Sequence, residues 1–219
     1  MKKKDDSGRY LFLLPVLLLL GTRAGIELFI RILPAQSAWI PSFGLYYILI
    51  ASLLIIAFKK KTIGLQSLSF RFRPAPNWKN LVFLIIVPGL LPLPVFILHI
   101  KEISLPYFLY ICIFSCINPV FEELFWRGLL YFAPGKKSFT VLFSAVMFSF
   151  SHYFLWGSYW FKNPYVLFPT LFSTFLMGLL WMWFVQKQKN IIYPIISHLL
   201  VDFFNLSVAA YSGIIFKIN

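Results

Sequence analysis

The sequence predicts an all-α membrane protein, a polytopic bundle of about seven to eight transmembrane helices. Of the 219 residues, 60% are hydrophobic and only 12% are charged, whereas a soluble domain is about half apolar and a quarter charged. The apolar residues come in continuous blocks of about 20, long enough for a helix to cross roughly 30 Å of hydrocarbon. A transmembrane β-barrel would instead show short segments of alternating polarity.

Seven apolar blocks follow one another along a single membrane domain, residues 1–219. They predict helices at residues 10–32, 39–58, 81–100, 106–132, 138–156, 165–186 and 191–216. The basic N-terminus followed by an apolar core resembles a signal peptide. No convincing small-x-small cleavage site follows it, so we expect an uncleaved first helix. Because Arg23, Glu27 and Arg31 recur every four residues, the membrane part of this helix could end at residue 22.

The third block carries three prolines, Pro88, Pro92 and Pro94. Proline removes a backbone donor and clashes with the preceding turn of a helix. We therefore expect residues 88–94 to break the block, which would create an eighth, short or re-entrant piece. In the fourth block, Cys112 and Cys116 lack partners at metal-like spacing, and we interpret them as small core residues.

The net charge of +13 does not predict a nucleic-acid partner, because the basic residues are confined to the joints between apolar blocks. In a membrane protein this distribution reports orientation. With seven crossings and a cytoplasmic N-terminus, most of the 20 Lys and Arg residues fall on the cytoplasmic side. We predict a multi-pass protein of the cell membrane. Its compact size and short loops suggest the cytoplasmic membrane of a bacterium.

Ionisable residues are rare inside the apolar blocks, and each charged one costs about 2.5–3.5 kcal/mol at a helix centre. Such residues face one another or a water-filled cavity, and are functional by default. At 1.5 Å per residue, Glu122, His152, His198 and Asp202 lie about 11–21 Å from the cytoplasmic ends of three predicted helices, so these four can meet in one layer. Six ionisable residues in all lie deep in the predicted helices. The six are Glu122, Glu123, Arg127, His152, His198 and Asp202.

The spacings within each helix indicate different roles for these residues. Glu123 and Arg127 are four apart and can pair along one face. Glu122 is rotated by about 100° from Glu123, so the same arginine cannot easily serve both carboxylates. His198 and Asp202 are also four apart and point the same way. A structural ion pair accounts for the presence of Glu123 and Arg127 in an apolar helix. No nearby base in the sequence neutralises Glu122, so we expect its carboxylate to be free to activate water.

Three motifs resemble those of a known family. Glu122-Glu123-x-x-x-Arg127, Phe148-x-x-x-His152 and His198-x-x-x-Asp202 are similar to the motifs of the CPBP family. This family comprises CAAX-protease and bacteriocin-processing intramembrane endopeptidases, also called type II CAAX prenyl proteases or the Abi family. The resemblance covers residues 106–208, and the first 100 residues match it only in general character.

The resemblance implies a glutamate-dependent protease that cleaves a membrane-associated protein or peptide. Glu122 would be the general base that activates water, with assistance from His152, while Glu123 and Arg127 would brace the site. His198 and the residue at 202 would stabilise the oxyanion. The family commonly has Asn or Asp at this last position. Because an ionised aspartate is a poor oxyanion donor, Asp202 either orients His198 or is protonated.

Metal use and two other function classes stay open at this point. His152, His198 and Glu122 would make an open zinc site chemically reasonable, but the H-E-x-x-H signature is absent, and we favour a direct glutamate mechanism without a cofactor. The chain could instead be a non-catalytic immunity or scaffolding relative. A proton-coupled transporter also uses buried acids and histidines, but transporters usually show repeated halves.

Overall fold

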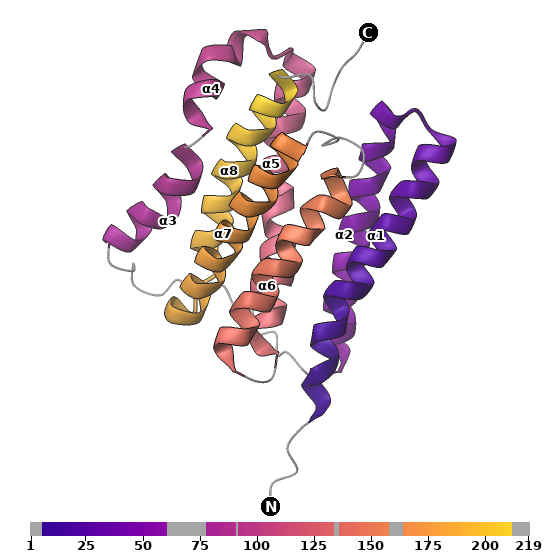
Figure 1. Cartoon of the computed structure of the whole chain (residues 1–219), viewed down its shortest axis with the longest axis vertical. Helices are drawn as coiled ribbons and strands as arrows, with labels where there is room; N and C mark the ends of the chain where they lie inside the picture. Colours follow the sequence, from indigo (N-terminus) through magenta and orange to yellow (C-terminus); the bar gives the residue numbers. More distant parts are fainter. Residues whose placement is uncertain (1–5, 61–77, 91, 134–135, 158–163, 212–219) are drawn as a thin grey trace, which may run out of the picture.

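The computed structural model describes residues 6–60, 78–90, 92–133, 136–157 and 164–211, and every regular element within these ranges is a helix. The prediction of an all-α bundle is confirmed. Figure 1 shows the helices packed side by side along one direction. The α-helices are α1 (Leu13–Ile32), α2 (Ala35–Lys59), α3 (Trp78–Leu90), α4 (Leu93–His99), α5 (Leu105–Glu123), α6 (Lys137–His152), α7 (Pro164–Gln188) and α8 (Ile192–Tyr211).

In the described part of the chain, five helical segments are long and apolar enough to cross a membrane. These segments are Arg9–Ile32, Ile40–Lys59, Leu105–Leu129, Lys137–Leu155 and Leu167–Gln188. Trp78–Leu90 and Ile192–Asn205 are shorter apolar helices. Together they match the seven predicted blocks, and the chain is a multi-pass membrane protein.

The first helix runs to Ile32 without interruption, as the predicted block 10–32 requires. Arg23 and Glu27 pair across one turn of its second half, with Nε and Oε1 2.7 Å apart. The expected break of the third block is confirmed, since α3 ends at Leu90 and α4 begins at Leu93, with Pro94 in its first turn. In Figure 1, α4 lies above α3 at one side of the bundle.

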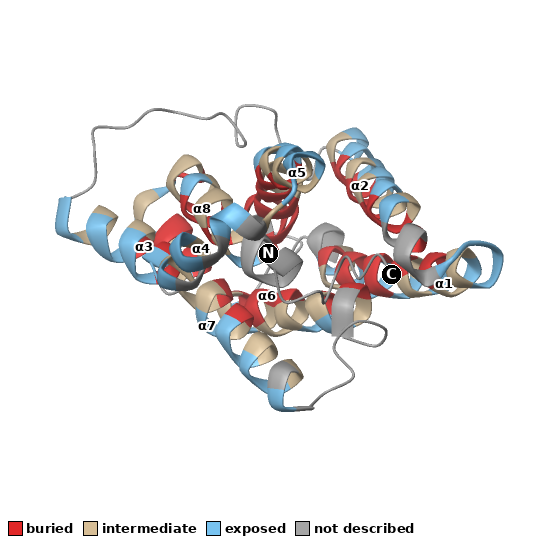
Figure 2. Ribbon diagram, turned by 90° about the horizontal axis from the view of Figure 1, so that it is seen from above, coloured by how far each residue is buried: buried red, intermediate tan, exposed pale blue. Residues whose placement is uncertain are grey.

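The helices pack in pairs that differ from their order in the sequence. The most extensive contacts join α6 with α7, α5 with α8, α3 with α8 and α1 with α2. Figure 2, which looks along the bundle, shows the buried faces turned inward and exposed residues around the outside. Hydrophobic side chains cover this outer surface, including Leu98 and Phe168, as expected of helices that face lipid.

Cys116 is also exposed and Cys112 half-buried, so the interpretation of both as core residues was wrong.

Basic side chains gather at one end of the bundle, the end from which the N-terminus leaves in Figure 1. The Lys60 ammonium lies 4.6 Å from the centre of the Tyr10 ring. Lys137 and Lys189 both lie over Tyr131, and Lys189 also donates to the Tyr131 hydroxyl. Segments far apart in the sequence thus bring their cations to the same end, as the positive-inside pattern requires.

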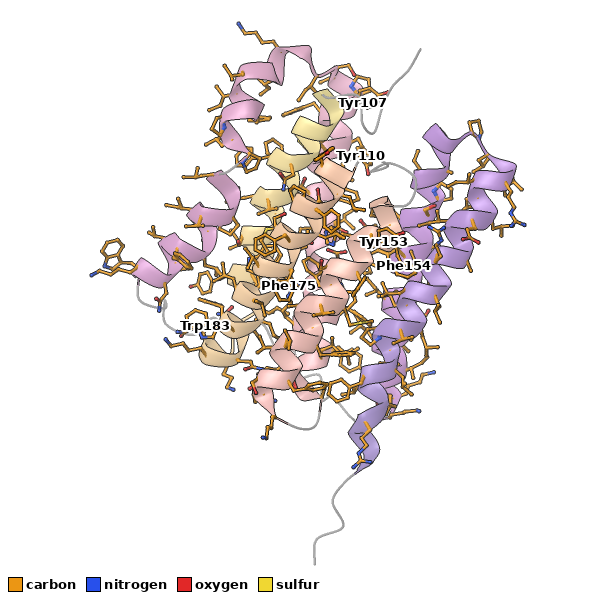
Figure 3. All side chains as sticks on the ribbon, viewed as in Figure 1. Tyr107, Tyr110, Tyr153, Phe154, Phe175 and Trp183 are labelled. Carbon is orange, nitrogen blue, oxygen red and sulfur yellow. The ribbon has the colours of Figure 1, made fainter. Side chains whose placement is uncertain are left out.

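Aromatic side chains mark both ends of the bundle. Figure 3 shows Trp183 near the lower end of α7, and Tyr107 near the upper end of α5. Trp183 is half-exposed, and the Lys187 ammonium lies 4.9 Å from the centre of its ring. Such rings with polar tips are typical of the two interfaces of a membrane.

Candidate active site

Glu122 is the last residue but one of α5, and its side chain is almost completely buried, 1% exposed. The Tyr46 hydroxyl, from α2, donates to Oε1 over 2.7 Å, and Trp126 Nε1 donates to this hydroxyl over 3.3 Å. The other oxygen, Oε2, lies 3.4 Å from Asn118 Nδ2 and 3.5 Å from His198 Nε2. One carboxylate oxygen is therefore held in place, and the second faces two nitrogen atoms.

Glu123 points to different partners, as its position next to Glu122 predicts. Its Oε1 accepts from Arg127 Nη1 over 2.8 Å and lies 2.9 Å from His198 Nδ1. The predicted pair of Glu123 with Arg127 is present, and the link to His198 is an addition that the sequence did not indicate. Because a carboxylate only accepts, Nδ1 of His198 carries a proton, and its Nε2 is the nitrogen that faces Glu122.

Aromatic faces surround the Arg127 guanidinium, whose side chain is fully buried. Its central carbon lies 4.0 Å from the centre of the Phe148 ring and 5.0 Å from that of Trp181. Within the described residues its Nε and Nη2 have no hydrogen-bond partner, and the attraction between cation and ring compensates part of that loss. Trp181 also stacks on His198, with centroids 4.6 Å apart.

Asp202 lies one turn beyond His198 on α8 and contacts two nitrogen atoms. Its Oδ1 is 3.4 Å from His198 Nε2, and its Oδ2 accepts from Asn118 Nδ2 over 2.8 Å. On the other side of the amide, the Tyr47 hydroxyl donates to Asn118 Oδ1 over 3.1 Å. Asp202 thus holds both nitrogen donors that face Glu122.

His152 ends α6 and borders the same cluster from another side. Its Nδ1 lies 3.0 Å from the carbonyl oxygen of Phe148, so this nitrogen carries the proton and Nε2 has the lone pair in the neutral ring. Within the described part of the chain its hydrogen bonds reach only its own helix. The Phe148 ring contacts both imidazoles, with centroids 4.7 Å from His152 and 5.9 Å from His198.

Each of the two helices that carry the first motifs changes to a π-helical turn directly after its site residue. The turn Leu124–Leu129 follows Glu123, and Tyr153–Gly157 follows His152. Wider turns of this kind often occur at functional sites. In the π-helical turn Leu124–Leu129, the Trp126 carbonyl accepts a hydrogen bond of 2.8 Å from the Ser144 hydroxyl of α6.

Five of the six predicted residues therefore contact one another, His152 borders them through the Phe148 ring, and three further residues complete the cluster. Asn118, Tyr46 and Tyr47 did not stand out in the sequence. Asn118 precedes Glu122 by four residues, a spacing that places both on one helix face and was the one available signal. Tyr46 and Tyr47 belong to a region outside the three motifs, and nothing distinguishes them from the other nine tyrosines of the chain.

No three His, Cys, Asp or Glu side chains converge with the geometry of metal ligands among the residues that the structure describes. His198 turns Nδ1 to Glu123 and Nε2 to Glu122 and Asp202.

Comparison with protein families gives one match, over residues 104–204, to the family described as type II CAAX prenyl endopeptidase Rce1-like. Comparisons with curated proteins and with solved structures give no match. The matched residues include all three motifs and every predicted site residue, in agreement with the resemblance drawn from the sequence. Residues 104–204 form a domain of the Rce1-like type II CAAX prenyl endopeptidase family, within the wider CPBP family of intramembrane proteases.

Proposed function

We propose that this protein is an intramembrane endopeptidase that hydrolyses a peptide bond of a membrane-associated protein or peptide. One observation carries the proposal. Glu122 is buried, its Oε1 is held by the Tyr46 hydroxyl, and its Oε2 faces two nitrogen atoms of other residues. The permanent cation of the cluster, Arg127, is paired with Glu123 and not with Glu122.

In the first step, Glu122 Oε2 takes a proton from water while the water oxygen bonds to the substrate carbonyl carbon. The π electrons of the carbonyl move to its oxygen, and the negative charge of Glu122 passes to this oxyanion. The lone pair on Nε2 of His152 accepts the other hydrogen of the water and orients it. In its protonated form, His198 donates from Nε2 to the oxyanion.

In the second step, the tetrahedral intermediate collapses and the bond between carbon and nitrogen breaks. Glu122 returns its proton to the leaving amine, which makes one residue the base of the first step and the acid of the second. Glu123 and Arg127 do not exchange protons in this scheme. They hold His198 and the end of α5, and the aromatic rings of Phe148 and Trp181 keep bulk water away from the guanidinium.

The proposal is tested by comparing the membrane proteins of cells that carry the wild-type protein, Glu122→Gln or His152→Ala. We expect both variants to insert and fold, and at least one membrane-associated protein to keep an uncleaved terminus in each. Normal processing in both variants would exclude the mechanism. Altered solute uptake with normal processing would indicate a transporter instead.

Zinc use is tested on the purified protein. In the mechanism proposed here a chelator leaves cleavage unchanged. Loss of cleavage, restored by zinc, would assign His152, His198 and Glu122 as ligands and replace the direct glutamate step.

A further inference from the structure

Asn118 is a buried amide in the cluster, 5% exposed, and lies on the same face of α5 as Glu122. Its orientation is fixed from both ends, because the Tyr47 hydroxyl contacts Oδ1 and the Asp202 carboxylate contacts Nδ2. With the amide turned around, its NH2 group would lose Asp202 as an acceptor and its oxygen would face that carboxylate. The amide NH2 group therefore points into the cluster.

The amide nitrogen Nδ2 carries two hydrogens, and each of them faces a different acceptor. One is donated to Asp202 Oδ2 over 2.8 Å, while the other faces Glu122 Oε2 at the longer distance of 3.4 Å. His198 Nε2 approaches the same Oε2 atom at 3.5 Å. Two nitrogen donors, each in contact with an oxygen of Asp202, thus converge on the carboxylate oxygen that receives the proton in the proposed mechanism.

We propose that Asn118 is an oxyanion-stabilising residue that acts beside His198, an inference that rests on the proposed endopeptidase function. Nucleophilic attack adds no net charge to the site. It forms the bond between water oxygen and carbonyl carbon, moves a proton to Glu122 Oε2 and leaves the negative charge on the former carbonyl oxygen. Glu122 becomes neutral and a weaker acceptor, so the second hydrogen of Nδ2 turns to the oxyanion.

This role explains why an acid occupies position 202. A carboxylate there cannot donate to an oxyanion, but it accepts from Asn118 and holds His198 Nε2 in place. The donating amide comes from α5 and its acceptor from α8. In this scheme Asp202 is a positioning residue, and Asn118 is the group that contacts the reacting oxygen.

Asn118→Asp tests the inference, because it keeps the shape of the side chain and replaces the donor by an acceptor. On the substrate that the wild type cleaves, we expect kcat to fall by about 10²–10³-fold, the cost of one oxyanion donor, with KM changed by less than about threefold. Asn80→Asp, in the first turn of α3 where a carboxylate is tolerated, is the matched control and keeps both constants.

A second variant, Asn118→Ala, removes the amide without adding a charge next to Glu122 and Asp202, and we expect the same loss of kcat. The inference is overturned if either variant keeps kcat within about threefold of wild type. It is equally overturned if KM rises at constant kcat, or if both variants lose the melting transition of the wild type, since Asn118 would then serve binding or folding.

Glu122→Gln, assayed alongside, separates the two proposals. If Glu122→Gln is inactive while the Asn118 variants cleave normally, only the role of Asn118 fails. If the wild type cleaves nothing, the endopeptidase function fails and the role of Asn118 with it. If Glu122→Gln cleaves like the wild type, the glutamate mechanism fails, and the role of Asn118 fails with that mechanism.

Discussion

At the residue scale, Arg127 shows how a charge is kept inside an apolar bundle. Its guanidinium gives one hydrogen bond to Glu123 and lies against the faces of Phe148 and Trp181. Glu123 in turn contacts His198. The pair that looked purely structural in the sequence therefore also fixes the tautomer and the position of an imidazole in the candidate active site.

Arg127→Ala should destabilise the protein severely, because it leaves the Glu123 carboxylate buried without its cation, at a cost of about 3–5 kcal/mol. Arg127→Lys keeps the charge but loses the flat surface that stacks on the rings, and we expect a smaller loss. The stability of both variants is measured as the apparent melting temperature of the protein in detergent. Arg23→Ala, at a pair that is partly exposed on α1, is the control and should shift it least. Equal melting of the Arg127→Ala variant and the wild type would contradict this account of the pair.

Sequence reasoning found the residues that carry charge in an apolar background, because their cost in a membrane makes each conspicuous. It did not find Tyr46, Tyr47 and Asn118, because uncharged polar side chains are not costly enough to stand out among the many aromatic and amide residues of a membrane helix. The contact of Glu123 with His198 was also missed, since spacing along one helix says nothing about which neighbouring helix it faces.

At the scale of elements, a π-helical turn follows both Glu123 and His152. A π-turn shifts the residues beyond it relative to those before it, so these side chains lie at a change in helix geometry. The prolines of the third block predicted its break correctly, because proline disrupts a helix by known sterics. No comparable residue signal exists for a π-turn, and none was predicted.

The packing of α6 against α7 depends on Gly178. A Cβ atom at this position would lie 3.0 Å from the backbone Cα of Ala145 and 3.3 Å from Phe148 Cδ1. Helices approach closely where small residues meet. A methyl group here would push α6 away, together with Phe148 and His152.

Gly178→Ala should therefore lower the melting temperature, by a free energy of roughly 1–3 kcal/mol, and reduce cleavage. Gly44→Ala is the matched control, because a Cβ at Gly44 meets nothing within 4 Å. Both changes raise helix propensity by about the same amount, so their difference isolates the clash. A Gly178→Ala protein as stable and active as the Gly44→Ala protein would contradict the close approach.

At the scale of the whole molecule, the seven apolar blocks predicted the helices well because a membrane imposes length and hydropathy on each span. The N-terminal region was expected to match the family only in general character. Its α2 nevertheless supplies the hydroxyl that contacts Glu122. Packing between distant segments decides this contact, and a single sequence does not reveal it.

The orientation of the bundle is a prediction with a direct test. In a protein without native cysteines (Cys112→Ala and Cys116→Ala), a cysteine replaces either Lys101 or Lys136, both exposed. With the N-terminus inside, a membrane-impermeant maleimide should label position 101 on intact cells. It should label position 136 only after the membrane is opened. The reverse pattern would place the basic end of the bundle outside.

The central claim is that Glu122 is the residue that activates water within this bundle. The most direct measurement is single-turnover cleavage by purified protein in vesicles, comparing wild type, Glu122→Gln and, as matched control, Glu27→Gln in the partly exposed pair on α1. We predict a rate loss of at least about 100-fold for Glu122→Gln, the range of general-base catalysis. Glu27→Gln should cleave at the wild-type rate, and both variants should keep the melting temperature of the wild type. A folded Glu122→Gln protein that cleaves within tenfold of the wild-type rate would contradict the claim.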